Sequence, residues 1–381
     1  MASVKVIGVG MSRFGKFPER SLMDMAVKAL REALKDSGVK PSRIEACFFA
    51  NALAGRLFGD FTVGQNVFWD VGIHKVPVVN VENACTSGST ALYLAVNTVA
   101  ADQAEIAVAV GAEKMYVPEF GLINSGQSEL DTQLGLVAPA SFALRAVRYM
   151  SEFGATPNQL ARVSVKNRRH AKDNPHAQFR EPITVEEVLT SPMIVDPLTR
   201  LQCCPIADGA AAAIVCSSSL ASSFKRAVAV DAALLSSGSY ENPQDLIRWE
   251  TDYRTCKSAY EKAGIGPEDL NVVEVHDAFT IAEILHYEAL GLCKAGEGAQ
   301  MVAEGQTALG GRCPVNVSGG LLSRGHPVGA TGIAQVYEIV TQLRKEAGNR
   351  QVEGARVGLA HCMGGDKAAD TKSCTVAIFS V

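Results

Sequence analysis

Hydrophobic and polar positions follow two recurring patterns along the chain. Short apolar runs at 5–9, 45–50, 78–81 and 106–111 predict buried strands. Between them lie segments whose apolar residues recur at helical spacing, of which Leu22–Ser37 is the clearest. Strands that alternate with helices indicate parallel pairing within a layered α/β fold.

The alternation is interrupted between about residues 113 and 201. Helices are predicted at 138–153 and 156–171, with no strand between them, and the stretch is too long for a simple connection. We therefore expect an inserted loop subdomain that covers a site. The apolar run 207–215 then returns to the sheet.

The second half of the chain repeats the theme of the first. Strands are predicted at 226–235 and 271–275, with a helix at 249–263 between them. The sequence Val79-Asn80-Val81 resembles Val315-Asn316-Val317, and each is followed by a helix of small residues. We predict two related halves, residues 1–225 (including the subdomain at about 113–201) and residues 226–381.

Composition narrows the functional classes. The chain has 381 residues, of which 47% are hydrophobic and 34 are glycine, as is typical of an α/β enzyme. A net charge of -4 gives no sign of a nucleic-acid partner, and no apolar run is long enough to cross a membrane. Because the N-terminus leads directly into a strand, we expect a cytoplasmic protein.

Two common kinds of site are not predicted. The ten cysteines include no C-x-x-C pair, so we expect no metal site and mostly reduced, structural thiols. Gly8-Val9-Gly10 begins like a dinucleotide-binding motif, but Arg13 occupies the place of its third glycine.

Cys85 is the first candidate for chemistry. It follows the strand 78–81 and precedes a helix that begins near Ser89. Unpaired N–H groups and the helix dipole favour an anion at such a position, so we expect a thiol with a lowered pKa that acts as a nucleophile. The alternative is a small buried residue that fills space between strand and helix.

Three further residues have similar surroundings far along the chain. His276, His326 and Cys362 each follow an apolar run and lie beside glycine or the start of a helix. Two thiols and two imidazoles on loops of this kind indicate acyl transfer.

The motifs around these residues resemble those of the thiolase family. The segments are Asn83–Gly88, Gly325-His326-Pro327 with Gly329-Ala330-Thr331-Gly332, and Cys362-Met363-Gly364. The resemblance covers nearly the whole chain and implies a duplicated five-layered αβαβα sandwich, with the loop subdomain covering coenzyme A.

One block is similar to the sterol-carrier-protein type of thiolase, namely His276-Asp277-Ala278-Phe279. That type usually has a cysteine at the position of Ala278 and lacks Cys362. The resemblance therefore implies that Cys362 supplies the second thiol here. It also implies that the acyl chain can be branched, sterol-derived or aromatic.

The resemblance implies a role for each candidate in cleaving a 3-ketoacyl-CoA with coenzyme A as co-substrate and no tightly bound cofactor. His326 takes the proton of Cys85, which becomes acylated, and Cys362 protonates the leaving enolate. His276 and His326 bind the enolate oxygen, while the backbone N–H groups of Cys85 and Gly364 bind the tetrahedral oxyanion.

Candidate coenzyme A contacts are less specific. Lys166, Arg168 and Arg169 can bind its phosphates, although a solvated charged helix face is the favoured explanation for this run. Ser318 and Gly319 are expected beside the thioester, where the absence of a side chain at Gly319 permits close approach.

The family implies a homodimer or a dimer of dimers, and some members work beside a small zinc-ribbon and OB-fold subunit. Two alternatives remain open. One is a decarboxylating or Claisen condensing enzyme that uses Cys85, His276 and His326. The other is a non-catalytic subunit that binds acyl-CoA or acts as a scaffold.

Overall fold

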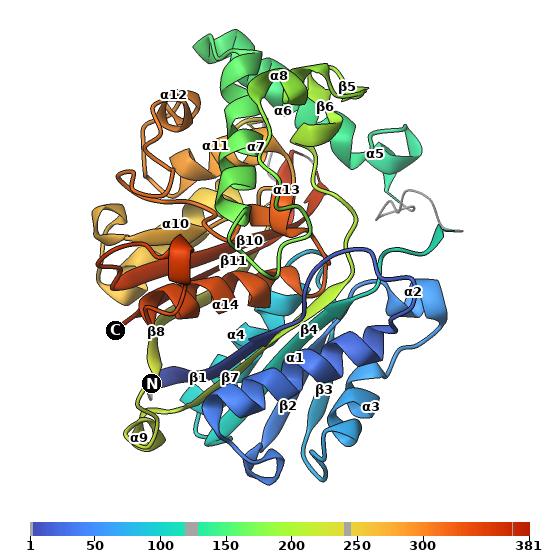
Figure 1. Cartoon of the computed structure of the whole chain (residues 1–381), viewed down its shortest axis with the longest axis vertical. Helices are drawn as coiled ribbons and strands as arrows, with labels where there is room; N and C mark the ends of the chain where they lie inside the picture. Colours follow the sequence, from blue (N-terminus) through green and yellow to red (C-terminus); the bar gives the residue numbers. More distant parts are fainter. Residues whose placement is uncertain (1–2, 119–128, 240–244, 368) are drawn as a thin grey trace.

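The computed structural model describes residues 3–118, 129–239, 245–367 and 369–381. Nine strands form one mixed sheet in the order β3-β2-β4-β7-β1-β8-β11-β10-β9 (Figure 1). Their bounds are β1 Val4–Met11, β2 Ala46–Ala50, β3 Val78–Val81, β4 Ile106–Glu113, β7 Gly209–Ser217, β8 Val228–Ser237, β9 Val272–Glu274, β10 Val357–Lys367 and β11 Asp370–Ser380.

The order of pairing is repeated in the two halves of this sheet. In the first half β3, β2 and β4 are parallel, and β7 and β1 are antiparallel to their neighbours. In the second half β9 and β10 are parallel, while β11 and β8 are antiparallel to their neighbours. Val315 forms a parallel bridge with Val273 of β9, at the place that β3 takes beside β2. This repetition agrees with the duplicated sandwich that the sequence predicts.

Helices lie between and outside the two half-sheets. Helices α4 (Ser87–Ala100) and α14 (Thr331–Leu343) pack against each other in the middle, and apolar residues of both half-sheets join their core. Helix α1 (Leu22–Ser37) covers the outer face of the first half, and α10 (Glu250–Ala263) covers that of the second (Figure 1). The result is a five-layered αβαβα arrangement.

The two central helices approach closely because glycines lie at their contact. A Cβ on Gly332 would lie 2.5 Å from the backbone nitrogen of Ser89, and one on Gly88 would lie 2.7 Å from the carbonyl oxygen of Gly329. Substitution of either residue would therefore separate the N-termini of α4 and α14, which carry the candidate chemistry.

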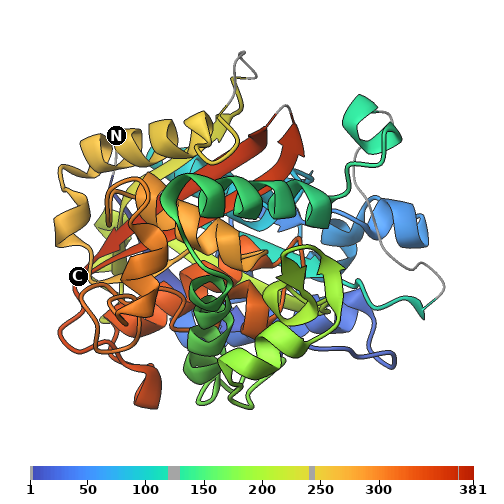
Figure 2. The same cartoon turned by 90° about the horizontal axis from the view of Figure 1, so that it is seen from above.

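The predicted loop subdomain contains α5 (Leu130–Gln133), α6 (Ala138–Phe153), α7 (Pro157–Ala171) and α8 (Val185–Thr190). Residues 119–128 of this region lie outside the described part of the chain. Helices α6 and α7 pack on α11 (Thr280–Ala289), and α7 also packs on α13 (Gly320–Arg324), so the insertion covers the second half (Figures 1 and 2). Shorter elements are α2 Ala54–Phe58, α3 Val63–Asp70, α9 Ser218–Ala221, α12 Gly298–Ala303, β5 Met193–Val195 and β6 Leu198–Thr199.

All ten cysteines are free thiols, and most of those expected to be structural are buried. None of the helices in the described ranges is both long enough and apolar enough to span a bilayer.

Candidate active site

Cys85 lies in a tight turn between β3 and α4. Ala84 has a φ of 47°, a left-handed conformation that is unusual for a residue with a side chain. The hydroxyl of Ser87 stabilises this turn, since it donates to the carbonyl of Ala84 at 2.6 Å and accepts from the N–H of Asn83 at 2.8 Å. Cys85 therefore stands two residues before the first residue of α4, half-buried at the helix N-terminus.

His326 faces Cys85 with its side chain in a defined orientation. Its Nε2 lies 3.4 Å from the Cys85 sulfur, and its Nδ1 lies 2.7 Å from the hydroxyl oxygen of Thr331. The hydroxyl of Thr331 donates its only proton to the carbonyl of Pro327 at 3.0 Å, so it accepts from Nδ1–H. In the neutral ring Nε2 is then unprotonated and can accept the thiol proton of Cys85.

The other two predicted groups converge on the same place. The Cys362 thiol donates to the backbone carbonyl of Cys85 at 3.1 Å. The ring of His276 packs edge to face against that of His326, with centroids 5.2 Å apart. Its Nε2 is buried and has no hydrogen-bond partner within the described structure, which leaves it available to a ligand. The structure thus brings together all four side chains predicted to be catalytic.

The pKa of Cys85 is shifted in the direction opposite to the prediction from the helix N-terminus. Burial raises this pKa to about 12, and the carboxylate of Glu113 adds to the effect. Burial also lowers the pKa of His326 to about 3, with a further contribution from Arg324. The resting pair is therefore a neutral thiol and a neutral imidazole, because desolvation outweighs the helix dipole.

Glu113 ends β4 and connects the loops around the site. Its two carboxyl oxygens accept the backbone N–H groups of Ala52, Leu53 and Gly329 and the side-chain amide of Asn51. Burial raises the pKa of Glu113 to about 7, and these four donors oppose that shift. Because every partner is a donor, the ionised carboxylate is the form that suits these contacts.

Backbone N–H groups near the nucleophile oppose the effect of burial on its pKa. Those of Gly365 and of Cys85 itself act to lower the pKa of the Cys85 thiol. Gly364, the predicted donor, is packed so closely that a Cβ would lie 2.9 Å from the carbonyl oxygen of Asn83. Gly365 therefore joins Gly364 and Cys85 as a candidate backbone donor to an oxyanion.

The predicted coenzyme A contacts on α7 have different surroundings. Lys166 is buried and forms an ion pair with Glu283 at 2.8 Å, so its ammonium group is engaged inside the protein. The guanidinium of Arg168 stacks over Phe179 at 4.3 Å, whereas Arg169 is exposed.

Ser318 and Gly319 also serve packing. The Ser318 hydroxyl donates to Glu274 at 2.6 Å, and a Cβ on Gly319 would lie 2.6 Å from that of Ala171 in α7. Gly319 has a φ of 99°, so its conformation and the packing of α7 both require a glycine there.

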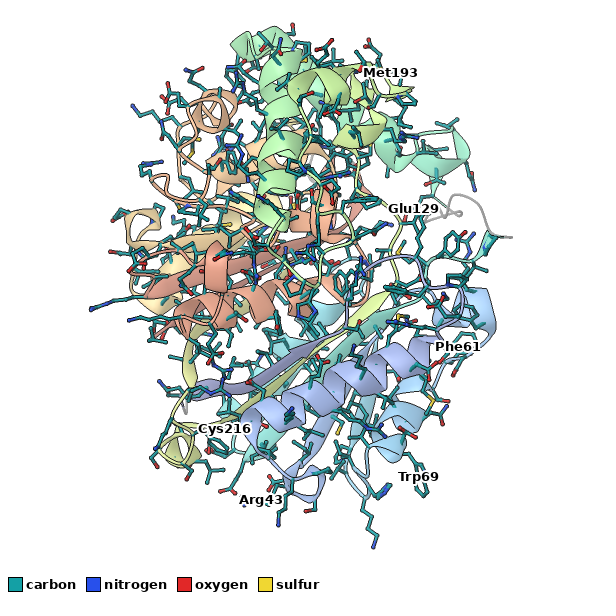
Figure 3. All side chains as sticks on the ribbon, viewed as in Figure 1. Arg43, Phe61, Trp69, Glu129, Met193 and Cys216 are labelled. Atoms are coloured by element: carbon teal, nitrogen blue, oxygen red, sulfur yellow. The ribbon has the colours of Figure 1, made fainter. Side chains whose placement is uncertain are left out.

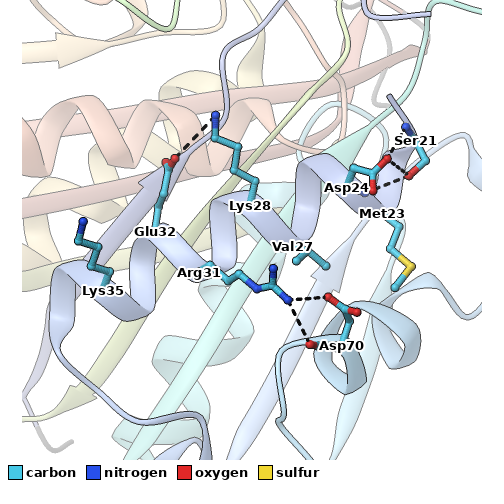
Figure 4. A pocket seen from close by; sticks show the side chains of 9 residues that line it. All are labelled: Ser21, Met23, Asp24, Val27, Lys28, Arg31, Glu32, Lys35 and Asp70. Carbon is cyan, nitrogen blue, oxygen red and sulfur yellow. Dashed lines mark hydrogen bonds and ion pairs between the residues drawn. The ribbon is translucent and has the colours of Figure 1, made fainter. Parts of the chain in front are cut away.

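A surface groove lies away from these residues, along α1 and beside α3 (Figure 4). Four of its charged side chains form two pairs: Arg31 contacts Asp70 at 3.0 Å, and Lys28 contacts Glu32 at 4.0 Å. Such paired surface charges indicate a solvated face and not a reactive site.

Sequence reasoning missed Thr331 and Gly365. Thr331 stands within the motif Gly329-Ala330-Thr331-Gly332, five residues after His326, where the first turn of a helix can return a hydroxyl to the preceding loop. Nothing in the sequence distinguishes Gly365 from Gly364.

Comparison with known proteins gives a consistent result. The family described as "Thiolase, N-terminal domain" matches residues 4–219, and "Thiolase C-terminal domain-like" matches residues 233–378. The benzoylsuccinyl-CoA thiolase subunit BbsB of Thauera aromatica is 41% identical, over 95% of this chain and 94% of its own. An acetyl-CoA acetyltransferase of Methanothermobacter thermautotrophicus is 40% identical, over 96% of this chain and 97% of its own. Human sterol carrier protein 2 is 38% identical, over 95% of this chain and 70% of its own.

Solved structures share the fold. The Ltp2-ChsH2(DUF35) aldolase matches with a TM-score of 0.83 and 26% identity, over 98% of this chain and 97% of its own. Human mitochondrial 3-ketoacyl-CoA thiolase in complex with CoA matches with a TM-score of 0.76 and 18% identity, over 100% and 98%. With the family matched over nearly the whole length, and with two thiols and two imidazoles meeting where the halves join, this chain belongs to the thiolase family and is an acyltransferase.

Proposed function

We propose that the protein cleaves a 3-ketoacyl-CoA with coenzyme A through an acyl-Cys85 intermediate. One observation carries this proposal: the Cys85 sulfur lies 3.4 Å from an imidazole nitrogen that is free to accept its proton. The second thiol and the unpartnered nitrogen of His276 lie at the same place. Attack, carbanion protonation and oxyanion binding each have a group within this cluster.

The steps follow from the neutral resting pair. Substrate binding excludes water, and the Cys85 proton moves to His326 Nε2 as the sulfur bonds to the ketone carbon C3. The C2–C3 bond then breaks, and its electron pair remains on C2 as the enolate of a CoA thioester. His276 and His326 stabilise the enolate oxygen, and the Cys362 thiol donates its proton to C2.

The second half of the reaction restores the enzyme. The Cys362 thiolate takes the thiol proton of an incoming coenzyme A, whose sulfur attacks the acyl carbon on Cys85. The N–H groups of Gly365 and Cys85 hold the oxyanion, and the bond to the Cys85 sulfur breaks. His326 returns its proton to Cys85, so all protons balance. A decarboxylating enzyme generates its own carbanion and has no use for the acid that Cys362 provides.

The acyl group that we propose is bulky, in the branched, sterol-derived or aromatic class. Support comes from the names of relatives, which include a benzoylsuccinyl-CoA thiolase and sterol carrier protein 2.

We also propose a homodimer, or a dimer of such dimers, formed through the edge strand β3. This strand ends the sheet, and its Val79 is 43% exposed. Nearby, Phe61 and Trp69 are 77% and 72% exposed on the side of α2 and α3 (Figure 3). Large apolar side chains beside an unpaired strand edge favour pairing with a second chain.

A small zinc-ribbon and OB-fold partner is a further proposal. Support comes from the likeness to the Ltp2-ChsH2(DUF35) aldolase, whose name joins two components, and from the word subunit in the name of BbsB.

The test is a panel of linear, branched and aromatic 3-ketoacyl-CoA substrates with free coenzyme A. We expect loss of the enolate absorbance, release of a shortened acyl-CoA, and an acyl adduct on Cys85 by intact mass when coenzyme A is omitted. Cys85→Ala is the control and forms no adduct. Carbon dioxide release from malonyl-CoA with an acyl primer would instead show a condensing enzyme, and the absence of an adduct would show a non-catalytic subunit.

A further inference from the structure

A second cluster of titratable side chains lies behind the active site, and the proposed reaction does not use it. Asp252 on α10, His286 on α11 and His361 on β10 are fully buried, with exposed fractions of 1% or less. Their ligand-type atoms all lie within 4.8 Å of one another. A buried carboxylate is costly unless it is paired, so the partners of Asp252 require explanation.

Hydrogen bonds connect this cluster to the loop that carries His276. Asp252 Oδ2 lies 2.7 Å from His286 Nδ1, and His286 Nε2 lies 3.2 Å from the backbone carbonyl oxygen of His276. Asp252 Oδ1 also lies 2.9 Å from His361 Nε2, a close contact whose geometry does not make a hydrogen bond. Trp249 stacks on the ring of His286, with centroids 5.3 Å apart, and fixes its plane.

The partners of His286 determine how many protons the pair holds. Both ring nitrogens face oxygens, one from a carboxylate and one from a carbonyl, and the carbonyl can only accept. If the imidazole is neutral and the carboxylate is ionised, His286 has only one N–H. The lone pair of its other nitrogen then faces the lone pairs of an oxygen. Both contacts are satisfied when the pair carries one more proton, either on His286 or on the Asp252 carboxyl.

The electrostatic surroundings of the pair act in both directions. Burial and His361 lower the pKa of His286 by more than Asp252 and the carbonyl of His276 raise it, so the additional proton is inferred from the hydrogen-bond geometry. Within the described residues, neither lysine nor arginine forms an ion pair with Asp252. Burial acts to raise the pKa of Asp252, but His361 and His286 outweigh it and hold that pKa well below its usual range. The other titratable groups around Asp252 are the thiols of Cys256 and Cys374, whose pKa values burial raises, so they are neutral.

The contact with the His276 carbonyl reaches the reaction site directly. His276 presents an unpartnered Nε2 beside His326, and its own backbone is held by the N–H of His286. Given the proposed function, a shift of this loop would move an oxyanion donor out of place without disturbing the pair of Cys85 and His326. We propose that Asp252 and His286 are positioning residues that hold His276 in its catalytic position, as a pair that shares one additional proton.

The test compares variants that keep or remove the donor to the His276 carbonyl. In Asp252→Asn the amide can donate to Nδ1, so a neutral His286 keeps its Nε2–H and kcat stays near wild type. Asp252→Leu and His286→Phe break the series of hydrogen bonds that ends at the His276 carbonyl. We expect kcat to fall about 10- to 100-fold with little change in KM, which is the range for a catalytic group displaced by about 1 Å. The rate of Cys85 alkylation is unchanged in all variants.

His176→Phe is the matched control, because His176 also packs against an aromatic ring, that of Tyr337 at 5.3 Å, without contacting the catalytic loops. Nitrogen-15 NMR of wild-type histidines should show a proton on His286 Nε2 and an Nδ1 that is either protonated or accepts a hydrogen bond, and this measurement does not depend on any variant folding. Any of four results would overturn the inference. The first two are a kcat for His286→Phe within twofold of wild type and an Asp252→Asn variant as impaired as Asp252→Leu. The others are an unprotonated His286 Nε2 and stoichiometric zinc bound to this cluster. If the wild-type protein cleaves no 3-ketoacyl-CoA, the proposed function is wrong. The NMR measurement still tests whether Asp252 and His286 share an additional proton.

Discussion

The hydroxyl of Thr331 is the smallest group on which the chemistry of Cys85 depends. It accepts from His326 Nδ1 and donates to the carbonyl of Pro327, and Thr331 is fully buried. In Thr331→Val a methyl group replaces the hydroxyl at nearly constant volume. The Pro327 carbonyl remains satisfied because the N–H groups of Ala330 and Thr331 also donate to it. The variant therefore removes a single interaction, the acceptor of His326 Nδ1–H.

The magnitude follows from that lost acceptor. A buried donor without a partner costs about 1–3 kcal/mol. The ring avoids this cost by placing its proton on Nε2, and in that form it cannot accept the thiol proton of Cys85. Because about 1.4 kcal/mol corresponds to a factor of ten, we expect Cys85 to be activated about 5- to 150-fold less effectively.

Two assays measure this effect. Alkylation of Cys85 by iodoacetamide, followed by peptide mass spectrometry, reports the thiol alone, and kcat for thiolysis reports the whole reaction. Both should fall in Thr331→Val, whereas Thr331→Ser keeps the hydroxyl and should stay near wild type. If the valine variant reacts at the wild-type rate in both assays, the hydroxyl does not set the tautomer of His326 and this explanation of Cys85 activation is wrong.

Three further predictions follow from the same structure. In Thr331→Val, where His326 cannot accept the thiol proton, alkylation has to proceed through the free thiolate. Because burial raises the pKa of Cys85 to about 12, the rate in this variant without substrate should rise roughly 100-fold between pH 7 and 9, whereas a preformed ion pair would give a flat profile. Glu113→Gln places an amide N–H against backbone donors such as that of Gly329, so urea denaturation should show a loss of about 1–3 kcal/mol of unfolding free energy, and an unchanged value would argue against the carboxylate contacts. Val79→Asp should shift the protein from dimer to monomer in light scattering, and a persisting dimer would place the interface elsewhere.

The sequence predicts which four side chains lie together because motifs carry residue identity and order. Cys85, His326, Cys362 and His276 were each recognisable by their neighbours, and the alternation of strands and helices indicated the sandwich. Their pKa values were not predictable, because the helix N-terminus at Cys85 is visible in the sequence whereas its burial is not. The same limit explains Lys166, which looks like a free cation on a basic helix but is neutralised by Glu283, a residue far along the chain.

The internal repeat explains why residues so distant in sequence form one site. Cys85 precedes α4 in the first half, and His326 lies in the loop before α14 in the second, so each stands near the N-terminus of the corresponding central helix. These two helices pack together through Gly88 and Gly332, which places the preceding loops beside each other. Neither half contains both the proposed nucleophile and its proposed base, and the contact between them spans 241 positions. The central core must therefore be assembled before Cys85 has a proton acceptor, and substitutions at the α4–α14 contact should abolish activity through displacement of His326 even where each half remains folded.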